Sequence, residues 1–253
     1  MTPLQLTTII LEIVRRAWRR LLRQPARLVG AIGTPLLLWL LIASGAARSF
    51  TPVGFDEVGY EAFMLPGIMT LITVFACIFS SITIIEDRNE GWLQALTVSP
   101  APRWTIAVGS IAGGATVGAL QALVLLPAAP LIGLALTPQG IVAATAAVAC
   151  TAIAMTALGL AFAWRCESSA GFHGVMNIVL MPMWLLSSAM FPIDGASAWI
   201  RAVMQLNPLT WCTEAIRAPL LGGEWLTSLV LSAGFAVAMI VIATAVIARR
   251  PKA

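Results

Sequence analysis

The sequence predicts an all-α, polytopic membrane protein with six transmembrane helices, and three observations lead to this fold class. Of the 253 residues, 59% are hydrophobic and 10% are charged, whereas soluble domains carry roughly 25% charged residues. The apolar residues form runs close to the roughly 20 residues that a helix needs to cross the hydrocarbon core of a bilayer. The basic residues gather beside these runs, as they do next to the cytoplasmic ends of membrane spans.

Six apolar runs are long enough to be spans. We expect transmembrane helices at about Leu28–Ala47, Glu61–Ile85, Trp104–Leu126, Ile141–Ala163, His173–Phe191 and Leu226–Ala248. The first span carries small residues at four-residue spacing, Ala26, Gly30 and Thr34, and such an edge favours close contact with a neighbouring helix. The chain therefore divides into an N-terminal segment 1–27, a six-span bundle 28–248 and a basic tail 249–253, all within a single transmembrane domain 1–253.

The distribution of Lys and Arg predicts the orientation. With the N-terminus inside, 12 of the 15 basic residues lie on the cytoplasmic side and Arg48, Arg201 and Arg217 lie outside. An excess of basic residues marks the cytoplasmic side of a membrane protein. We therefore expect both termini in the cytoplasm, which agrees with an even number of spans.

The N-terminal segment predicts an amphipathic helix that lies in the membrane interface. Between Leu4 and Leu22, apolar residues that include Trp18 recur at three- and four-residue spacing. The other face carries arginines, among them Arg15, Arg16, Arg19 and Arg20. A solvated basic helix is the alternative, but it would expose the apolar stripe to water, so we favour the interfacial helix.

A second amphipathic region lies between the fifth and sixth spans. The segment Pro192–Glu224 is too charged to cross the membrane, yet its apolar residues are helically spaced. Short interfacial or re-entrant helices on the outer side fit this pattern. Within it, Glu214 and Arg217 stand three residues apart and are expected to pair with each other.

For two further groups of residues, helix packing is a simpler explanation than a ligand site. Gly109 and Gly113, and in another register Gly114 and Gly118, are spaced by four in the third span, which favours close helix contacts. His173 and Asn177 lie one turn apart at the start of the fifth span. A lone interfacial histidine is usually structural, although polar groups that face a bundle interior can line a pathway.

The cytoplasmic loop between the second and third spans reads EDRNEGWLQALTVSPAPR, from Glu86 to Arg103. Acidic residues at its start suit the positive end of a helix dipole, and Ser99, Pro100 and Pro102 stop the helix after about two turns. An interfacial loop helix and a helix that docks on another protein are both consistent with its apolar side.

This loop resembles the coupling helix of type 2 ATP-binding-cassette (ABC-2) export permeases of the drug-efflux and nodulation type. The family pattern is an acidic pair, a Glu-Gly, a hydrophobic helix and a Ser/Thr-Pro. The matching residues are Glu86, Asp87, Glu90, Gly91, Leu93, Leu96, Ser99 and Pro100, with Arg88 inside the pattern and Trp92 as a departure from it.

The resemblance extends along most of the chain. The Arg-rich segment before Gln24-Pro25 is similar to the family's gate or connecting helix, and YEAFMLPG from Tyr60 is similar to its second-span entry. The runs MPMWLLSSAMFPI from Met181, Asn207-Pro208-Leu209-Thr210 and Glu214-Ala215-Ile216-Arg217 are similar to its fifth span and external helices.

The resemblance implies a permease in a prokaryotic plasma (inner) membrane that works with a nucleotide-binding ATPase subunit. Lys252 is the only lysine in the sequence, so the chain has no P-loop of the form GxxxxGK[ST]. The chain is expected to bind no cofactor, with ATP and Mg held by the partner. A half-transporter also needs a second permease copy, for which a homodimer is the default.

The remaining functional classes are an enzyme, a channel and a scaffold. Ser187 or Ser188 with His173 is the only nearby nucleophile and base, and they would stand about 21 Å apart along one helix. One histidine and dispersed cysteines provide no metal site, so no catalytic residue is predicted.

A membrane scaffold or channel-like protein is the alternative to an exporter, but charged residues to line an aqueous pore are absent from the spans. That scarcity favours a hydrophobic, amphipathic or lipid-linked cargo.

Overall fold

The computed structural model describes residues 3–46, 58–92 and 102–248, and every regular element within these ranges is helical. The α-helices and two 3-10 turns are α1 (Pro3–Arg23), α2 (Pro25–Ala46), α3 (Tyr60–Asn89), α5 (Arg103–Leu123), η1 (Leu126–Ile132), α6 (Pro138–Ala163), α7 (Ser169–Leu185), η2 (Ile193–Gly195), α8 (Ala198–Leu206), α9 (Pro208–Leu221) and α10 (Leu226–Ala248). The prediction of an all-helical fold is confirmed for the described residues.

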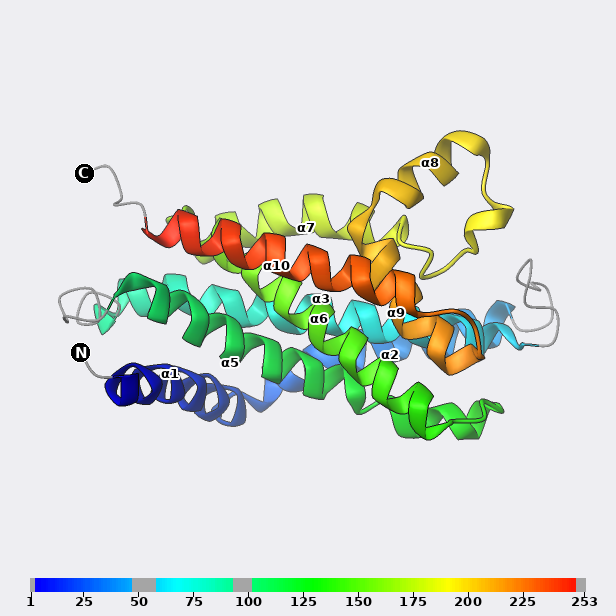
Figure 1. Ribbon diagram of the computed structural model, residues 1–253, viewed down its shortest axis with the longest axis horizontal. Coiled ribbons are helices and arrows are strands. Elements are labelled where there is room, and N and C mark those ends of the chain that lie inside the picture. The colour runs from blue at the N-terminus through cyan, green and yellow to red at the C-terminus, as the bar shows by residue number, and fades with distance from the viewer. Residues whose placement is uncertain (1–2, 47–57, 93–101, 249–253) are drawn as a thin grey trace.

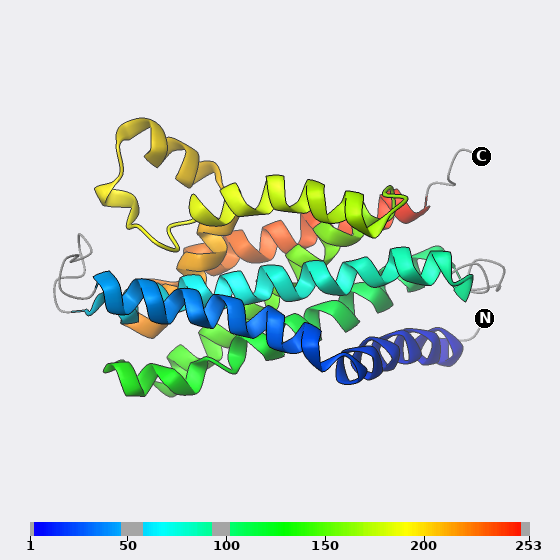
Figure 2. The ribbon, with the colours of Figure 1, turned by 180° about the vertical axis from the view of Figure 1, so that it is seen from behind.

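The helices form an elongated bundle (Figure 1). Helices α2, α3, α5, α6, α7 and α10 run alternately in opposite directions along its length, as both views show (Figures 1 and 2). Helix α1 lies at the end of the bundle where α10 finishes, and we call this the α1 end. Helices α8 and α9 lie at the other end, which we call the α9 end.

Helix α3 forms the centre of the bundle and packs against α2, α5, α6, α7 and α9. Its side chains are buried around almost the whole circumference, and Phe63, Met64, Ile68 and Ile72 are fully buried. A helix that is hydrophobic on all sides is expected at such a central position. Both ends of α3 therefore sit where several other helices can reach them.

Local sequence signals set several helix ends. Pro25 cannot continue the preceding helix, so α1 ends at Arg23 and α2 begins directly after Gln24. Ser168 caps α7, because its Oγ accepts a hydrogen bond of 3.1 Å from the backbone N–H of Gly171. Asn207 caps α9 in the same way, with Oδ1 accepting from the N–H of Leu209 at 3.0 Å.

Within the described residues, five helical segments are long and apolar enough to cross a membrane. They are Leu28–Gly45, Tyr60–Asn89, Arg103–Ile132, Pro138–Ala163 and Leu226–Ala248. They coincide with the expected spans one, two, three, four and six. The chain is thus a helical protein of the membrane-spanning type.

The expected fifth span at His173–Phe191 differs from the structure. Helix α7 runs from Ser169 to Leu185, so its 17 residues rise about 26 Å, somewhat less than the roughly 30 Å of a hydrocarbon core. The chain leaves the helix because Asn207 Nδ2 donates to the carbonyl groups of Met183 and Leu186, at 2.6 and 2.9 Å. Ser188 then adopts a left-handed conformation with φ of 58°.

The small-residue edge of the first span also lies differently from our expectation. Ala26, Gly30 and Thr34 are exposed, and no atom lies within 4 Å of the position that a Cβ on Gly30 would take. This edge is left exposed within the described chain, because α2 packs on α3 through its opposite side, where Ala31 and Trp39 are buried.

Candidate functional site

The acidic residues of the expected loop lie on the last turns of α3. Asp87 Oδ1 accepts hydrogen bonds from Arg16 Nη2 at 2.6 Å and from Arg20 Nη1 at 2.8 Å. Glu86 Oε2 accepts from Arg20 Nη2 at 2.6 Å. Because the Asp87 side chain is only 8% exposed, these are partly buried charge-assisted bonds, which are stronger than those between exposed groups. They fix α1 to the end of α3.

This arrangement corrects the prediction that Glu86 and Asp87 begin a separate loop helix. They lie near the C-terminal end of α3, where the helix dipole disfavours negative charge. The guanidinium groups of Arg16 and Arg20 supply the compensating positive charge. The long helix can therefore continue through the acidic pair to Asn89.

Arg88 connects α3 to a different part of the bundle. Its Nη1 donates to the carbonyl group of Cys166 at 3.0 Å, and its Nη2 donates to that of Trp164 at 2.7 Å. These carbonyl groups follow the end of α6, where a cation also interacts favourably with the helix dipole. The run Glu86-Asp87-Arg88 thus joins α1, α3 and the α6–α7 connection, and we call it the α3 junction.

Glu90, Gly91 and Trp92 follow the α3 junction in the chain. Glu90 lies 3.6 Å from both Arg16 and Arg20 with a 59% exposed side chain, so its pairing is looser than that of Asp87. Gly91 has a φ of +78°, which suits glycine. The guanidinium of Arg16 lies over the ring of Trp92, 4.1 Å from its centroid. Leu93 and Leu96 lie outside the described residues.

Two of the predicted packing glycines bring α1 against α5. A Cβ on Gly109 would meet Ile13 Cδ1 at 2.9 Å, and a Cβ on Gly113 would meet Ala17 Cβ at 3.0 Å. Trp18 adds a hydrogen bond of 3.2 Å from Nε1 to Thr116 Oγ1. Of the other arginines of α1, Arg15 pairs with Glu12 at 2.8 Å and Arg19 is exposed.

The other two predicted glycines bring α5 against the centre of the bundle. A Cβ on Gly114 would meet Thr156 Cγ2 of α6 at 2.5 Å, and one on Gly118 would meet Cys77 Sγ of α3 at 2.5 Å. The four glycines therefore lie at contacts inside this chain, and the close packing links α1, α5, α3 and α6.

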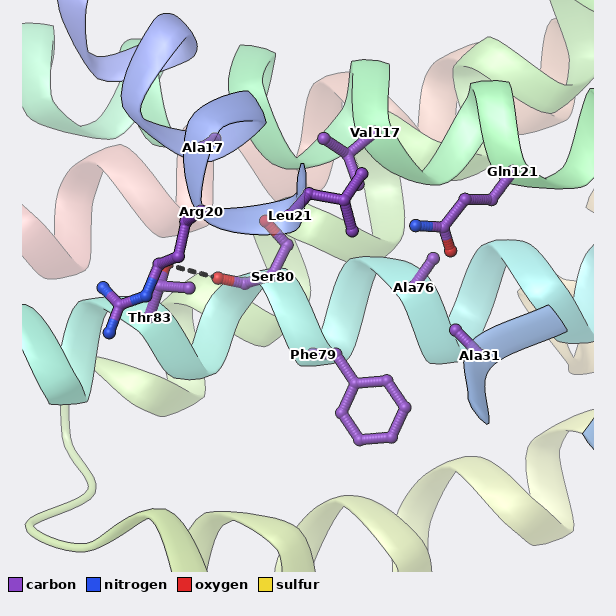
Figure 3. Close-up of a pocket in the computed structure, with 10 residues that line it drawn as sticks. All are labelled: Ala17, Arg20, Leu21, Ala31, Ala76, Phe79, Ser80, Thr83, Val117 and Gln121. Atoms are coloured by element: carbon purple, nitrogen blue, oxygen red, sulfur yellow. Dashed lines mark hydrogen bonds between the residues drawn. The ribbon is translucent and has the colours of Figure 1, made fainter. Parts of the chain in front are cut away.

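A small cavity of about 30 Å³, lined mostly by apolar side chains, lies where α1, α3 and α5 meet, next to the α3 junction. Figure 3 shows Arg20 of α1, Ser80 and Thr83 of α3, and Gln121 of α5 around it. Thr83 Oγ1 donates to the carbonyl group of Ser80 at 2.6 Å. Gln121 Oε1 is buried without a hydrogen-bond partner among the described residues, so this cavity has room and a polar group for one water molecule.

The predicted outer residues form a second polar cluster at the α9 end. Pro208 is the first residue of α9, directly after the cap Asn207. Arg217 pairs with Glu214, and it also donates to the carbonyl groups of Ser188 at 2.7 Å and Phe63 at 3.3 Å. Its side chain is only 1% exposed. Arg217 is therefore a buried link between α9, α3 and the segment after α7.

His173 and Asn177 line a cavity of about 480 Å³ between α3 and α7. The other lining residues are apolar: Leu71, Val74, Phe75, Ile78, Phe79, Met176, Leu180 and Met181. The ring of His173 lies edge-on to that of Phe79, with 5.7 Å between centroids. An apolar cavity with a few polar groups at one side suits an amphipathic small molecule.

The sequence did not point to three of these contacts. Arg88 donates to carbonyl groups of the α6–α7 connection, and Ser188 Oγ donates to Glu214 at 2.6 Å. Gln121 lines the small cavity beside residues of α1 and α3. In each case the residues that come together are far apart in the chain. The adjacent acidic and basic residues of Glu86-Asp87-Arg88 were the one available signal, because they require partners of both charges.

A bundle of apolar helices, five of them in the described part of the chain long enough to cross a membrane, defines a multi-span membrane protein. The profile of the ABC-2 type transporter family matches residues 8–221. The chain therefore belongs to the ABC-2 type transporter family.

Individual relatives agree with the family. The chain is 27% identical to the transport permease ycf38 of Cyanophora paradoxa, over 85% of this chain and 75% of the relative. It is 26% identical to nodulation protein J of Neorhizobium galegae, over 81% and 78% of the two chains. It is 26% identical to the multidrug ABC transporter permease YbhR of Escherichia coli K12, over 62% of this chain and 43% of the relative.

Proposed function

We propose that this chain is the permease subunit of an ATP-binding-cassette exporter, and that a separate ATPase subunit drives it from the segment Glu86–Leu96. The observation that carries the proposal is the α3 junction. Glu86 and Asp87 bind α1, Arg88 binds the α6–α7 connection, and the segment that continues from Glu90 is joined directly to all of them. A push on this segment would move the central helix together with its neighbours.

The source of energy lies on another chain in this proposal. With Lys252 as its only lysine, the sequence holds no P-loop. ATP and Mg would therefore bind to the ATPase subunit, and this chain would hold no cofactor and catalyse no reaction.

The proposed topology has six spans with both termini in the cytoplasm. Helix α1 lies at the end of the bundle where α10 finishes. Most of the basic residues in the described ranges belong to that end, as the excess of cytoplasmic charge requires. In this topology α7 is the fifth span, and α8 and α9 are the external helices. The membrane is the plasma (inner) membrane of a prokaryote.

The cargo in this proposal is hydrophobic, amphipathic or lipid-linked. The cavity between α3 and α7 supports this, because its wall is apolar apart from His173 and Asn177. One relative carries a nodulation name and another a multidrug name, so lipo-oligosaccharides and drugs belong to the same range of candidates as lipids and glycolipids.

A second permease copy would complete the transport path. The exposed small-residue edge of α2 offers a place for close contact between two copies, because Ala26, Gly30 and Thr34 let helix backbones approach. A homodimer with two ATPase subunits is therefore the proposed assembly.

Co-purification with the cognate ATPase tests the proposal. We expect Glu90→Lys and Leu93→Asp each to lower the recovered ATPase and the transport rate by about tenfold or more, because a desolvated charge at a docking surface costs about 2–5 kcal/mol. Glu224→Lys is the matched control, since it makes the same charge change on an exposed residue beyond α9. Native association and transport in both loop variants would disprove docking at this segment.

A further inference from the structure

A polar pocket on α1 lies beside the α3 junction and shares Arg16 and Arg20 with it. It has a volume of about 520 Å³, and its wall includes Arg16, Arg19, Arg20 and Arg23 of α1, with Glu90 and Trp92 opposite them. The four arginines are spaced by three and four residues, so they share one face of the helix. We call this cavity the arginine pocket.

The arginines of the pocket fall into two pairs. Arg16 and Arg20 are compensated, because they hold Asp87 and Glu86. Arg19 and Arg23 are exposed, and no carboxylate of residues 3–46, 58–92 or 102–248 forms an ion pair with either of them. Glu12, which also lines the pocket, is paired with Arg15. The pocket thus has two guanidinium groups for which the described part of the chain supplies no counter-charge.

We propose that the arginine pocket binds a phosphate-bearing anion. A guanidinium group presents parallel N–H donors that match the oxygen atoms of a phosphate, and the volume is that of a small-molecule site. Two sources share this chemistry: the headgroup of an anionic phospholipid and a free phosphate compound. The lipid source rests on the proposed placement of α1 at the cytoplasmic surface, where basic residues attract anionic headgroups.

A bound anion would act on the same junction that couples the helices. Arg16 and Arg20 line the pocket and also hold the end of α3. An anion bound beside them would also give Arg19 and Arg23 the counter-charge that the described residues do not supply. Occupancy of the pocket is therefore expected to stabilise α1 in its docked position.

Binding is measured on the purified permease without an ATPase. Native mass spectrometry reports the phosphatidylglycerol that the protein retains from mixed phosphatidylglycerol and phosphatidylcholine nanodiscs. Thermal unfolding reports stabilisation by short-chain phosphatidylglycerol or by inorganic phosphate at constant ionic strength. We expect Arg19→Gln/Arg23→Gln to weaken the apparent affinity by about 25-fold, at roughly fivefold per arginine.

Two further variants make the result specific. Arg103→Gln/Arg165→Gln removes the same charge from the same end of the bundle, away from the pocket, and is expected to change the affinity less than twofold. Arg19→Lys/Arg23→Lys keeps the charge but removes the parallel N–H donors of the guanidinium groups, so an intermediate loss of affinity is expected. Because Arg19 and Arg23 are exposed, both of their variants should unfold at the native temperature in the absence of ligand.

The two ligands distinguish the sources. Stabilisation by phosphatidylglycerol alone identifies a lipid headgroup, and stabilisation by inorganic phosphate as well identifies a site open to free phosphate compounds. Absence of binding by both ligands, or an equal loss in the pocket and control variants, would overturn the proposal. Either outcome is independent of ATPase docking, which is measured by co-purification.

Discussion

At the scale of the residue, Asp87 has the clearest energetic role. Its buried carboxylate accepts from both Arg16 and Arg20, so Asp87→Asn weakens two charge-assisted bonds in a partly buried site. We expect it to lower the free energy of unfolding by about 1.5–3 kcal/mol, as measured by denaturant titration of the purified protein.

Glu12 provides the matched comparison for Asp87. It also pairs with an arginine of α1, but both side chains are about half exposed, and exposed pairs contribute about 0.2–1 kcal/mol. Glu12→Gln should therefore cost clearly less than Asp87→Asn. Equal costs would mean that burial of the junction adds nothing to the strength of its ion pairs.

At the scale of the element, α3 and the segment after α7 are in unusually close contact. A Cβ on Gly67 would lie 2.6 Å from the carbonyl oxygen and 2.7 Å from the Cα of Ala189. The same region is bonded by Trp184 Nε1 to the carbonyl of Gly67 at 3.0 Å. Because the clash is with backbone atoms, Gly67→Ala is expected to cost about 1–3 kcal/mol.

Gly234→Ala is the control for this contact, because a Cβ on Gly234 of α10 would have no atom within 4 Å. This substitution should leave the free energy of unfolding unchanged or raise it by up to about 1 kcal/mol, since alanine is the better helix former. Native stability of Gly67→Ala would show that the segment after α7 can move away from α3 without loss.

The elements also show what the sequence could and could not predict. The apolar run of α10 gave its bounds, Leu226–Ala248, without error, because length and hydropathy define an isolated span. The ends of α3 and α7 were missed. Asp87 remains in α3 and Leu186 leaves α7 through bonds to Arg16 and Asn207, and residues that far away are invisible to a local pattern.

Arg217 shows the same limit at the site. Its pairing with Glu214 follows from their spacing in the sequence, whereas its burial follows from the carbonyl groups of Phe63 and Ser188. A buried guanidinium is stable only where its donors are satisfied, and that condition is met by three separate segments. The sequence could therefore predict the pair but not its place within the bundle.

At the scale of the whole molecule, two opposite faces of the bundle differ in what they offer a second copy. Helix α2 lies in front in Figure 2, and α10 lies in front in Figure 1. Both expose apolar side chains, and both expose small residues at four-residue spacing: Ala26, Gly30 and Thr34 on α2, and Gly234 and Ala238 on α10. Close approach of two backbones needs such an edge, and the longer one is on α2, so the proposed homodimer should form through α2.

Disulfide crosslinking in native membranes tests this face. Thr34→Cys should give a crosslinked dimer as the main product, because Cα atoms must approach within about 4.4–6.8 Å for a disulfide to form. Val237→Cys is the control, since Val237 is 60% exposed in the middle of α10 on the opposite side. The native cysteines Cys77 and Cys212 are buried, and Cys150 and Cys166 are replaced by alanine in both variants to remove background. Dimers through Val237→Cys with none through Thr34→Cys would place the second copy against α10, and the transport path would then have to be built around that helix.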